Sequence, residues 1–248
     1  MAQDERIYPD PDSGMFAFHL FRYLWVLPYA YNKVVLDAGC GAGYGANVMD
    51  AVAGRVVAVD RDPAVIARNR SLYARAANLT FTAMDLTACG LVSSRFDLVV
   101  SFEVFEHLDS DSADRYVREM WRVCRARGSV VFSTPNRLVE APHLRSAGIV
   151  YEHHVNSVSP TELRRVLSRH FPRVTLYGQR PKERPLKRAL KALDVLNLRH
   201  HVLSHRTKTR WDVALSGGVP SYGPDPSQFE ITPSLLRQSG TIVAVCSK

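Results

Sequence analysis

Glu103, Glu106 and His107 stand within five residues of one another. They follow an apolar run at Phe96–Ser101 that favours a strand, so they are expected at the end of that strand. An imidazole there can remove a proton from a hydroxyl group, because its pKa lies close to neutrality. Carboxylates and imidazoles are also ligands for divalent cations. The residues alone leave both uses open, together with a third in which Glu103 only shapes a pocket.

A glycine-rich turn is the second place where chemistry is expected. Four glycines lie in the nine residues Asp37–Gly45, after the short apolar run Lys33–Asp37. Glycines let the backbone approach a ligand closely, and a helix that follows such a turn offers free N–H groups. The spacing Gly41-x-Gly43-x-x-Ala46 also satisfies the fingerprint of dinucleotide-binding proteins. The turn therefore predicts a cofactor but does not identify it.

Three carboxylates at successive strand ends narrow the choice of cofactor. Asp60 suits the ribose hydroxyls of either kind of cofactor. Asp37 would repel a pyrophosphate, but it suits the ammonium and sulfonium groups of S-adenosylmethionine (SAM). Asp85 is placed to accept from an adenine amino group, with Leu86 flanking the ring. In the competing interpretation, Asp60 and Asp85 only cap helices or turns.

The elements that must position these residues alternate between strand-like and helix-like runs, which predicts an α/β fold with a mostly parallel sheet and helices on both faces. Besides the run that ends at Asp37, the expected strands are Arg55–Asp60, Leu79–Met84, Phe96–Ser101, Ser129–Ser133, Arg173–Tyr177 and Thr241–Cys246. The expected helices are Phe16–Ala30, Gly43–Val52, Pro63–Ala76, Asp114–Arg125 and Pro160–His170. Asn136–Asn156 and Ser216–Ser227 are expected to be loops.

The length and composition fit one ordinary globular domain. The chain has 248 residues, of which 46% are hydrophobic, and no apolar run approaches a membrane span. The four scattered cysteines suit a reducing cytoplasm. We expect a single domain over residues 1–248, with a cofactor cover at 1–31, a cofactor-binding core at 32–135 and a C-terminal part at 136–248.

The formal net charge of +8 is concentrated in one segment. Residues 180–210 hold ten basic and two acidic side chains, so this segment alone equals the net charge of the chain. A solvated helical face is the favoured interpretation, and a patch for an anionic substrate, a nucleic acid or a membrane surface is the alternative.

Several of these motifs together resemble class I SAM-dependent methyltransferases, over most of residues 20–180. The similarity rests on the glycine turn, Asp60, Asp85, Phe96–Val100 and Gly128–Asn136. It looks closest to the small-molecule branch, with its ubiquinone-biosynthesis O-methyltransferases and tailoring enzymes of glycans and natural products. The resemblance implies a Rossmann-like, mostly parallel seven-stranded sheet with an antiparallel last strand. It implies SAM contacts from Tyr23, Asp37, Gly39, Cys40, Gly41, Gly43, Asp60, Arg61, Asp85, Leu86, Ser101 and Glu103.

The resemblance also implies which residues would activate the methyl acceptor. Some relatives with a Glu-x-x-Glu-His motif use it, with a later histidine, to bind magnesium or a similar ion. His154 resembles that later histidine, next to Glu152 and His153. The implied catalytic residues are His107, Glu106 and His154, and the implied metal ligands are Glu103, Glu106, His107 and His154.

The expected function is methyl transfer to an oxygen, or with less support a nitrogen, of a small acceptor such as a sugar, a phenol or a natural product. An RNA methyltransferase that uses residues 180–210 is the first alternative. The turn Thr134-Pro135-Asn136 opposes it, because it lacks the Asn-Pro-Pro-Tyr signature of enzymes that methylate base nitrogens. A dinucleotide-dependent oxidoreductase or a cofactor-binding module without catalysis is the alternative of another class. The oligomeric state is not predicted.

Overall fold

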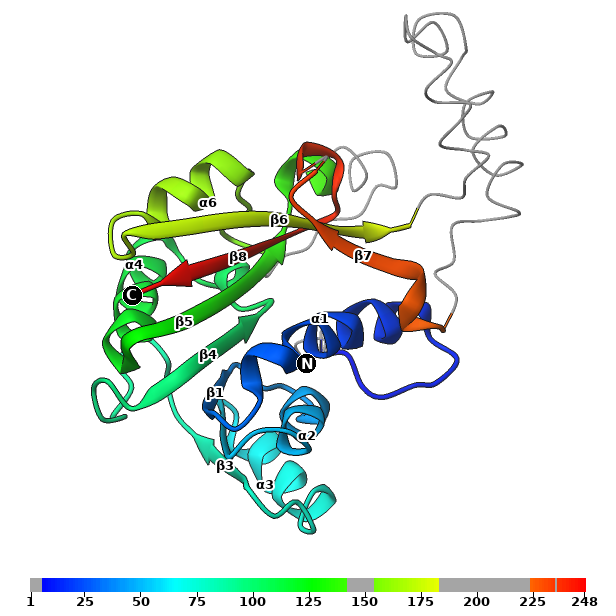
Figure 1. Cartoon of the computed structure of the whole chain (residues 1–248), viewed down its shortest axis with the longest axis vertical. Coiled ribbons are helices and arrows are strands. Elements are labelled where there is room, and N and C mark those ends of the chain that lie inside the picture. The colour runs from blue at the N-terminus through cyan, green and yellow to red at the C-terminus, as the bar shows by residue number, and fades with distance from the viewer. Residues whose placement is uncertain (1–5, 142–153, 183–223, 235) are drawn as a thin grey trace, which may run out of the picture.

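The protein is built around one eight-stranded sheet with the strand order β3-β2-β1-β4-β5-β8-β6-β7 (Figure 1). The computed structural model describes residues 6–141, 154–182, 224–234 and 236–248. Strands β1 to β5 pair in parallel, whereas β8 is antiparallel to both β5 and β6. The strands are β1 Val34–Ala38, β2 Arg55–Asp60, β3 Leu79–Ala83, β4 Phe96–Phe102, β5 Cys124–Pro135, β6 Arg173–Pro181, β7 Phe229–Thr232 and β8 Thr241–Ser247.

All seven expected strands are present, and the antiparallel last strand is confirmed. The expected number of seven is one too few, because β7 adds an eighth strand that pairs antiparallel with β6 at the sheet edge. With four residues next to a Gly- and Pro-rich stretch, β7 is too short to show a period in the sequence. Strand β5 also begins five residues before the expected start at Ser129.

Helices cover both faces of the sheet, as expected (Figure 1). On one face α1, α2 and α3 pack with inward residues such as Val35 and Val131, and on the other face α4 and α6 pack with Leu36 and Val130. Neighbouring strand residues point to opposite faces, so most of the strands contribute side chains to both cores. The helices are α1 Gly14–Ala30, α2 Tyr44–Asp50, α3 Pro63–Leu72, α4 Ser110–Val123 and α6 Pro160–Leu167, with short 3-10 turns η1 Phe105–His107, η2 Pro226–Gln228 and η3 Leu236–Gln238.

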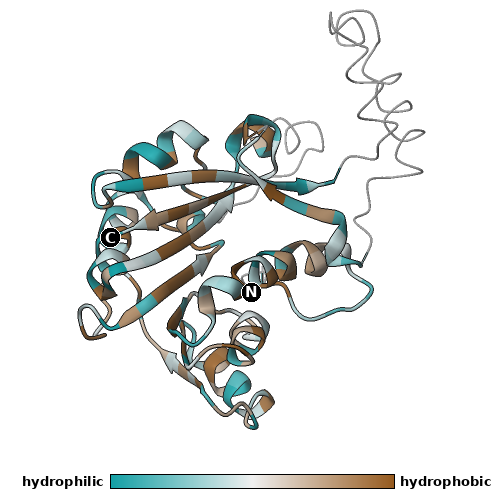
Figure 2. Cartoon of the chain, viewed as in Figure 1, coloured by the Kyte–Doolittle hydropathy of each residue, from teal (hydrophilic) through white to brown (hydrophobic). Residues whose placement is uncertain are grey.

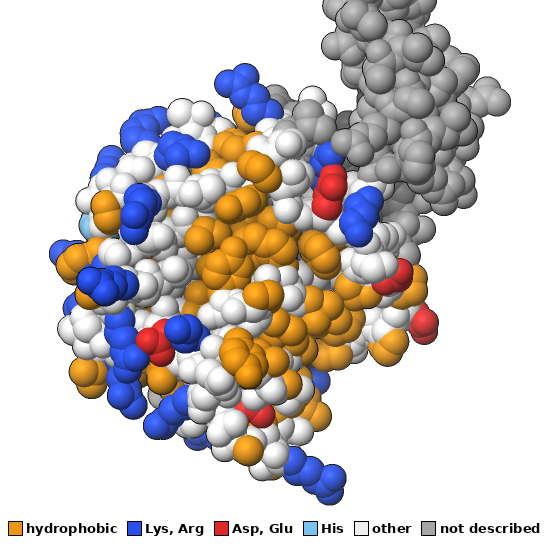
Figure 3. Space-filling model, in the orientation of Figure 1, with side chains coloured by type: hydrophobic (Ala, Val, Ile, Leu, Met, Phe, Trp, Pro, Cys, Tyr) orange, Lys and Arg blue, Asp and Glu red, His pale blue; other side chains and the backbone are white. Residues whose placement is uncertain are grey.

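The hydrophobic residues concentrate in the strands, and the outer helix surfaces are polar (Figure 2). Helix α1 is an exception, since it exposes Met15, Leu24 and Tyr29. Hydrophobic side chains gather over the middle of the face on which α1 lies (Figure 3). The inner side of α1 is fixed to the far end of the sheet, where Gln179 Nε2 donates to the Phe18 carbonyl oxygen over 2.6 Å. The Phe18 and Phe229 rings meet edge to face at 5.1 Å.

The segment expected as a loop at Asn136–Asn156 begins differently, because residues 137–141 are helical. Glu152 and His153 lie outside the described residues, and so does the basic segment from residue 183 onward. Among the residues that the structure describes, no helix combines the length and the apolar character needed to cross a bilayer.

Candidate active site

The glycine turn between β1 and α2 has the backbone that a closely bound ligand requires. Gly39, Gly41 and Gly43 all have positive φ angles, of 85°, 48° and 78°. A side chain is disfavoured at such angles, and a Cβ atom at Gly39 would also collide with Val104. The turn is held from outside, because Asn69 Nδ2 donates to the Gly41 carbonyl oxygen over 2.8 Å.

Asp37 lies at the end of β1, fully buried beneath this turn. Its Oδ1 accepts from the Tyr23 hydroxyl over 3.4 Å, and its Oδ2 has no hydrogen-bond partner among the described residues. Burial raises the pKa of Asp37 to about 7, although the hydrogen bond from Tyr23 works in the opposite direction. A cation that approaches this buried carboxylate would stabilise its ionised form.

Asp60, at the end of β2, connects its strand to the glycine turn. Its Oδ2 accepts from the Gly41 amide over 3.0 Å, and its Oδ1 accepts from the Asp62 amide over 3.0 Å. Arg6 reaches the same carboxylate at 3.4 Å. The side chain is thus next to the turn, where the sequence predicts it, and is already part of a hydrogen-bond network.

The other predicted cofactor residues lie in different surroundings. Asp85 is exposed, and its Oδ1 accepts from both the amide and the hydroxyl of Thr87, which lowers its pKa. Leu86 is buried in the core. Cys40 is buried, which raises the pKa of its thiol, and Arg61 is exposed. Ser101 is buried, with its hydroxyl 2.5 Å from the Ala38 carbonyl oxygen.

Glu103 follows β4 with a left-handed backbone, at a φ of 55°. Its Oε1 accepts from the Ser133 hydroxyl over 2.6 Å and lies 3.1 Å from Arg22 Nη1. The Arg22 guanidinium is itself buried on α1, and it lies over the Phe18 and Phe102 rings. The carboxylate is therefore committed to an ion pair that joins β4 to α1.

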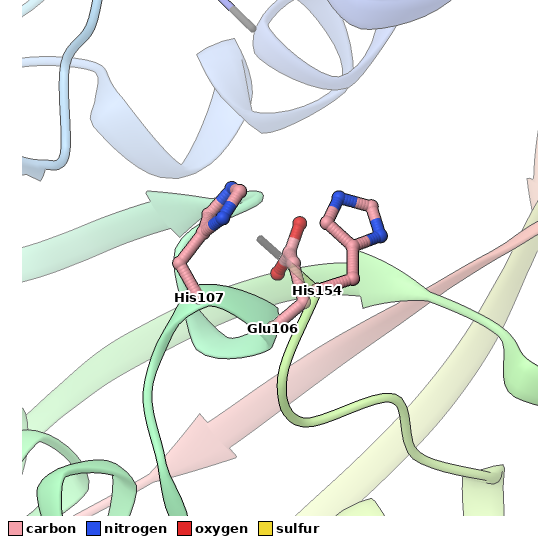
Figure 4. A group of neighbouring side chains, drawn as sticks. All are labelled: Glu106, His107 and His154. Carbon is pink, nitrogen blue, oxygen red and sulfur yellow. The ribbon is translucent and has the colours of Figure 1, made fainter. Parts of the chain in front are cut away.

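Glu106, His107 and His154 converge at the carboxyl end of β4 (Figure 4). One ligand atom from each residue lies within 4.8 Å of the others. Glu106 is buried on η1, where its Oε2 accepts from the Thr134 hydroxyl over 3.1 Å. Burial raises the pKa of Glu106, and the nearby Glu103 carboxylate raises it further.

The two histidines of this cluster come from segments far apart in the chain. Their rings meet edge to face, with centroids 5.2 Å apart. His154 Nδ1 lies 3.1 Å from Oε1 of Glu140, on the helical turn 137–141. The sequence patterns gave no sign of Glu140, because it falls in a segment expected to be a loop. Three of the four predicted metal ligands thus lie together, while Glu103 is held by Arg22 and Ser133.

The comparisons with known proteins match part of this chain. Residues 36–132 match the model of the methyltransferase domain family. The chain is 39% identical over 140 residues to a probable S-adenosylmethionine-dependent methyltransferase of Mycobacterium tuberculosis, which is 56% of this chain and 49% of that protein. It is 30% identical over 123 residues to a ubiquinone biosynthesis O-methyltransferase of Pseudomonas putida, 48% of this chain and 52% of that protein. The chain thus spans about half the length of these relatives.

The fold comparison covers the whole sheet. A SAM-dependent methyltransferase from Archaeoglobus fulgidus superposes with a TM-score of 0.60 at 16% identity, over 94% of this chain and 93% of that one. This likeness shows the fold, which is the Rossmann-like class I methyltransferase fold. Within this fold, residues 36–132 are the part that matches the methyltransferase domain family, and the relatives of this chain include a probable SAM-dependent methyltransferase.

SAM fits the residues that line the turn. The cofactor carries an ammonium and a sulfonium group but no phosphate, and the buried Oδ2 atom of Asp37 lacks a partner among the described residues. The three left-handed glycines leave the backbone open to close contact.

Proposed function

We propose that this protein transfers the methyl group of SAM to an oxygen atom of a small acceptor. The observation that carries the proposal is the convergence of Glu106, His107 and His154 within 4.8 Å, at the sheet edge where the glycine turn lies. Ligands of open α/β sheets bind at the carboxyl ends of the strands, so donor and acceptor would meet there.

The donor would be held by the turn and by the acids around it. Asp37 is the candidate partner of the SAM ammonium group, because its buried carboxylate has an oxygen to spare. Asp60 is the candidate partner of the ribose hydroxyls, and it also fixes the Gly41 amide. Tyr23, packed edge to face against Phe102 at 5.0 Å, would close the cleft from α1.

The imidazoles of His107 and His154 would act on the acceptor. SAM would supply a methyl group on a sulfonium that leaves as a neutral thioether, so that the acceptor oxygen gains the methyl group and must lose its proton. The hydroxyl proton passes to an imidazole nitrogen, which stabilises the transition state of the transfer. The other role of the protein is to hold both reactants in line and exclude water.

The same three residues also fit a divalent cation, with one buried carboxylate oxygen and two imidazole nitrogens as ligands. Glu106, His107 and His154 would hold the ion, while Glu103 stays paired with Arg22. A bound cation would polarise the acceptor oxygen and make its proton easier to remove. Calorimetric titration with magnesium and with manganese tests this use. Binding that His154→Ala abolishes supports it, and no heat with either ion contradicts it.

Oxygen is favoured over nitrogen as the acceptor atom, although the relatives include enzymes of both kinds. A hydroxyl must lose a proton to become a good nucleophile, and two imidazoles stand ready to accept one. A small acceptor is favoured over RNA because Thr134 and Asn136 are engaged inside the fold. They are therefore not free to read a base.

The test is calorimetric titration of the whole protein with SAM and, separately, with NAD. We expect SAM to bind and NAD not to bind. Asp60→Ala should weaken SAM binding at least tenfold, while Asp62→Asn, which keeps the α3 cap, should not. Sugars and phenols are then screened as acceptors with radiolabelled SAM. Absence of SAM binding in the wild type, or tight binding of NAD, overturns the proposal.

A further inference from the structure

We propose that Glu140 is a positioning residue for His154: its carboxylate fixes the Nδ1–H tautomer of the imidazole and so directs the basic Nε2 atom to the acceptor. The role in methyl transfer rests on the function proposed above. The pairing itself does not, because it concerns the free protein.

The pair is close and shielded from water. His154 Nδ1 lies 3.1 Å from Glu140 Oε1, and the two side chains are only 16% and 14% exposed. At this distance the nitrogen donates its proton to the carboxylate oxygen. Nδ1 is then occupied, and Nε2 on the other edge of the ring keeps its lone pair. Figure 4 shows this ring beside Glu106 and His107.

Glu140 is held in place by the end of β5. The buried Asn136 follows this strand, and its Nδ2 donates to the carbonyl oxygens of Leu236 and Ser239 over 3.1 and 2.9 Å. The Asn136 Oδ1 atom accepts from the Leu138 amide over 3.2 Å, and its backbone oxygen accepts from the Glu140 amide over 2.9 Å. One asparagine therefore starts the helical turn and anchors it to the loop before β8.

The His154 side of the pair is equally fixed. The Asn156 amide donates to the Glu106 carbonyl oxygen over 3.0 Å, which holds the segment against η1. The Arg137 amide donates to the Val158 carbonyl oxygen over 3.0 Å. The two segments thus meet directly, and Glu140 and His154 are positioned by contacts on both sides.

A carboxylate in this position has two effects on a histidine base. It selects the tautomer with the proton on Nδ1, and it fixes the orientation of the imidazole ring. The structure records a hydrogen bond to the ring between His154 Nδ1 and Glu140 Oε1, so Glu140 is the carboxylate to test. Glu140 would act through His154 and would not touch the acceptor itself.

A second pair provides a matched control. His170 Nε2 lies 3.1 Å from Asp114 Oδ1, the same distance as in the pair under test, but Asp114 is 44% exposed and stands on α4. Neither residue belongs to the cluster of Glu106, His107 and His154. Asp114→Ala thus removes a carboxylate from a histidine elsewhere in the fold.

The first experiment reads the tautomer directly. The whole protein is labelled with ¹⁵N-histidine, His154 is assigned with His154→Gln, and its ring ¹⁵N shifts are recorded at about pH 8, where a histidine of ordinary pKa is neutral. We expect the Nδ1–H form in the wild type and in Glu140→Gln, whose amide oxygen still accepts. Glu140→Ala should shift His154 toward the Nε2–H form, and Asp114→Ala should not. An Nε2–H form in the wild type, or an unchanged tautomer in Glu140→Ala, overturns the proposal.

The second experiment measures turnover with the acceptor identified by the screen. Glu140→Ala should lower kcat about 10- to 100-fold, the usual cost of losing the carboxylate behind a functional histidine. Glu140→Gln should recover part of the loss, and the Kd for SAM should not change in either variant. Wild-type turnover in Glu140→Ala overturns the positioning role. If SAM does not bind to the wild type, the proposed function fails, but the tautomer result still decides whether the pair exists.

Discussion

Asp37 is a buried acid with a pKa of about 7, so binding that needs its ionised carboxylate should depend on pH. If its carboxylate pairs with the SAM ammonium group, the bound state needs the ionised form. Below pH 7 a proton must first leave, so the affinity for SAM should rise up to tenfold per pH unit as the pH approaches 7 and then level off. Calorimetry from pH 5 to pH 8, in buffers of different ionisation enthalpy, measures both the affinity and the released proton.

Asp37→Asn provides the control for this pH dependence. An amide has the same shape but does not ionise, so SAM should bind more weakly and with little change between pH 5 and pH 7. A variant that keeps the wild-type slope would assign the titration to another group. Asp97→Asn, at the amino end of β4 and thus away from the glycine turn, should keep the slope.

Gly39 tests the close approach of the backbone at the turn. A methyl group at this position meets two obstacles, the φ angle of 85° and the Val104 side chain. The left-handed backbone costs a residue with a Cβ atom about 1–2 kcal/mol, and the collision adds to this. Gly39→Ala should therefore lower both the thermal stability and the SAM affinity. Val104→Ala in the same chain should restore only the part due to the collision, so full recovery in a thermal melt contradicts the backbone argument.

At the scale of elements, the strands could be predicted because each is a short apolar run, and several of these runs end on an acid or a glycine. Val34–Ala38 before the glycine turn and Arg55–Asp60 are the plainest cases. Strand β7 could not be predicted, since four residues cannot establish a period of two. It forms because Phe229 packs against α1 and its backbone pairs with β6, and both contacts are distant in sequence.

In the candidate site, too, some residues could be predicted from local sequence and others depend on distant contacts. Glu106 and His107 could be found from their place after β4, because local sequence decides where a strand ends. Glu140 could not, because its placement depends on hydrogen bonds from Asn136 to residues about a hundred positions away. The pairing of Glu103 with Arg22 depends on the placement of α1 over the sheet. Contacts of this kind leave no pattern in a single sequence.

Helix α1 yields a prediction at this scale. Gln179 is fully buried on β6, and its amide donates to the Phe18 carbonyl oxygen over 2.6 Å. Gln179→Ala removes this hydrogen bond between β6 and α1, whose net contribution to stability is about 0.5–1.5 kcal/mol. Because α1 also carries Arg22 and Tyr23, we expect faster amide hydrogen exchange across Gly14–Ala30 and weaker SAM binding. Unchanged exchange in α1 would show that Phe18 and Phe229 hold the helix without this bond.

At the scale of the whole molecule, the sheet places its most costly groups at one edge. Asp37 and Glu106 are buried carboxyl groups with raised pKa values, at the ends of neighbouring strands. These groups cost stability, because a buried carboxylate loses its hydration, whereas an apolar residue in the same place has no charge to desolvate. Such groups are typical of sites that work on a ligand.

The whole-molecule prediction concerns stability against pH. In the unfolded chain Asp37 loses its proton near pH 4, but in the folded protein it keeps the proton until about pH 7. The folded state thus binds more protons in this window, and its contribution to the free energy of unfolding falls as the pH rises from 4 to 7. Burial lowers the pKa of His19, which acts in the opposite direction below pH 6.5, so wild type and Asp37→Asn must be compared.

Relative to the wild type, Asp37→Asn should gain stability between pH 4 and pH 7, by up to about 4 kcal/mol for a shift of about three pKa units. Denaturant unfolding at pH 5 and pH 8 measures the difference. Saturating SAM should narrow this gap at pH 8, because the ammonium group stabilises the ionised Asp37 of the wild type and finds only a neutral amide in the variant. If SAM stabilises both proteins equally at pH 8, Asp37 does not bind the cation, and its buried charge needs another explanation.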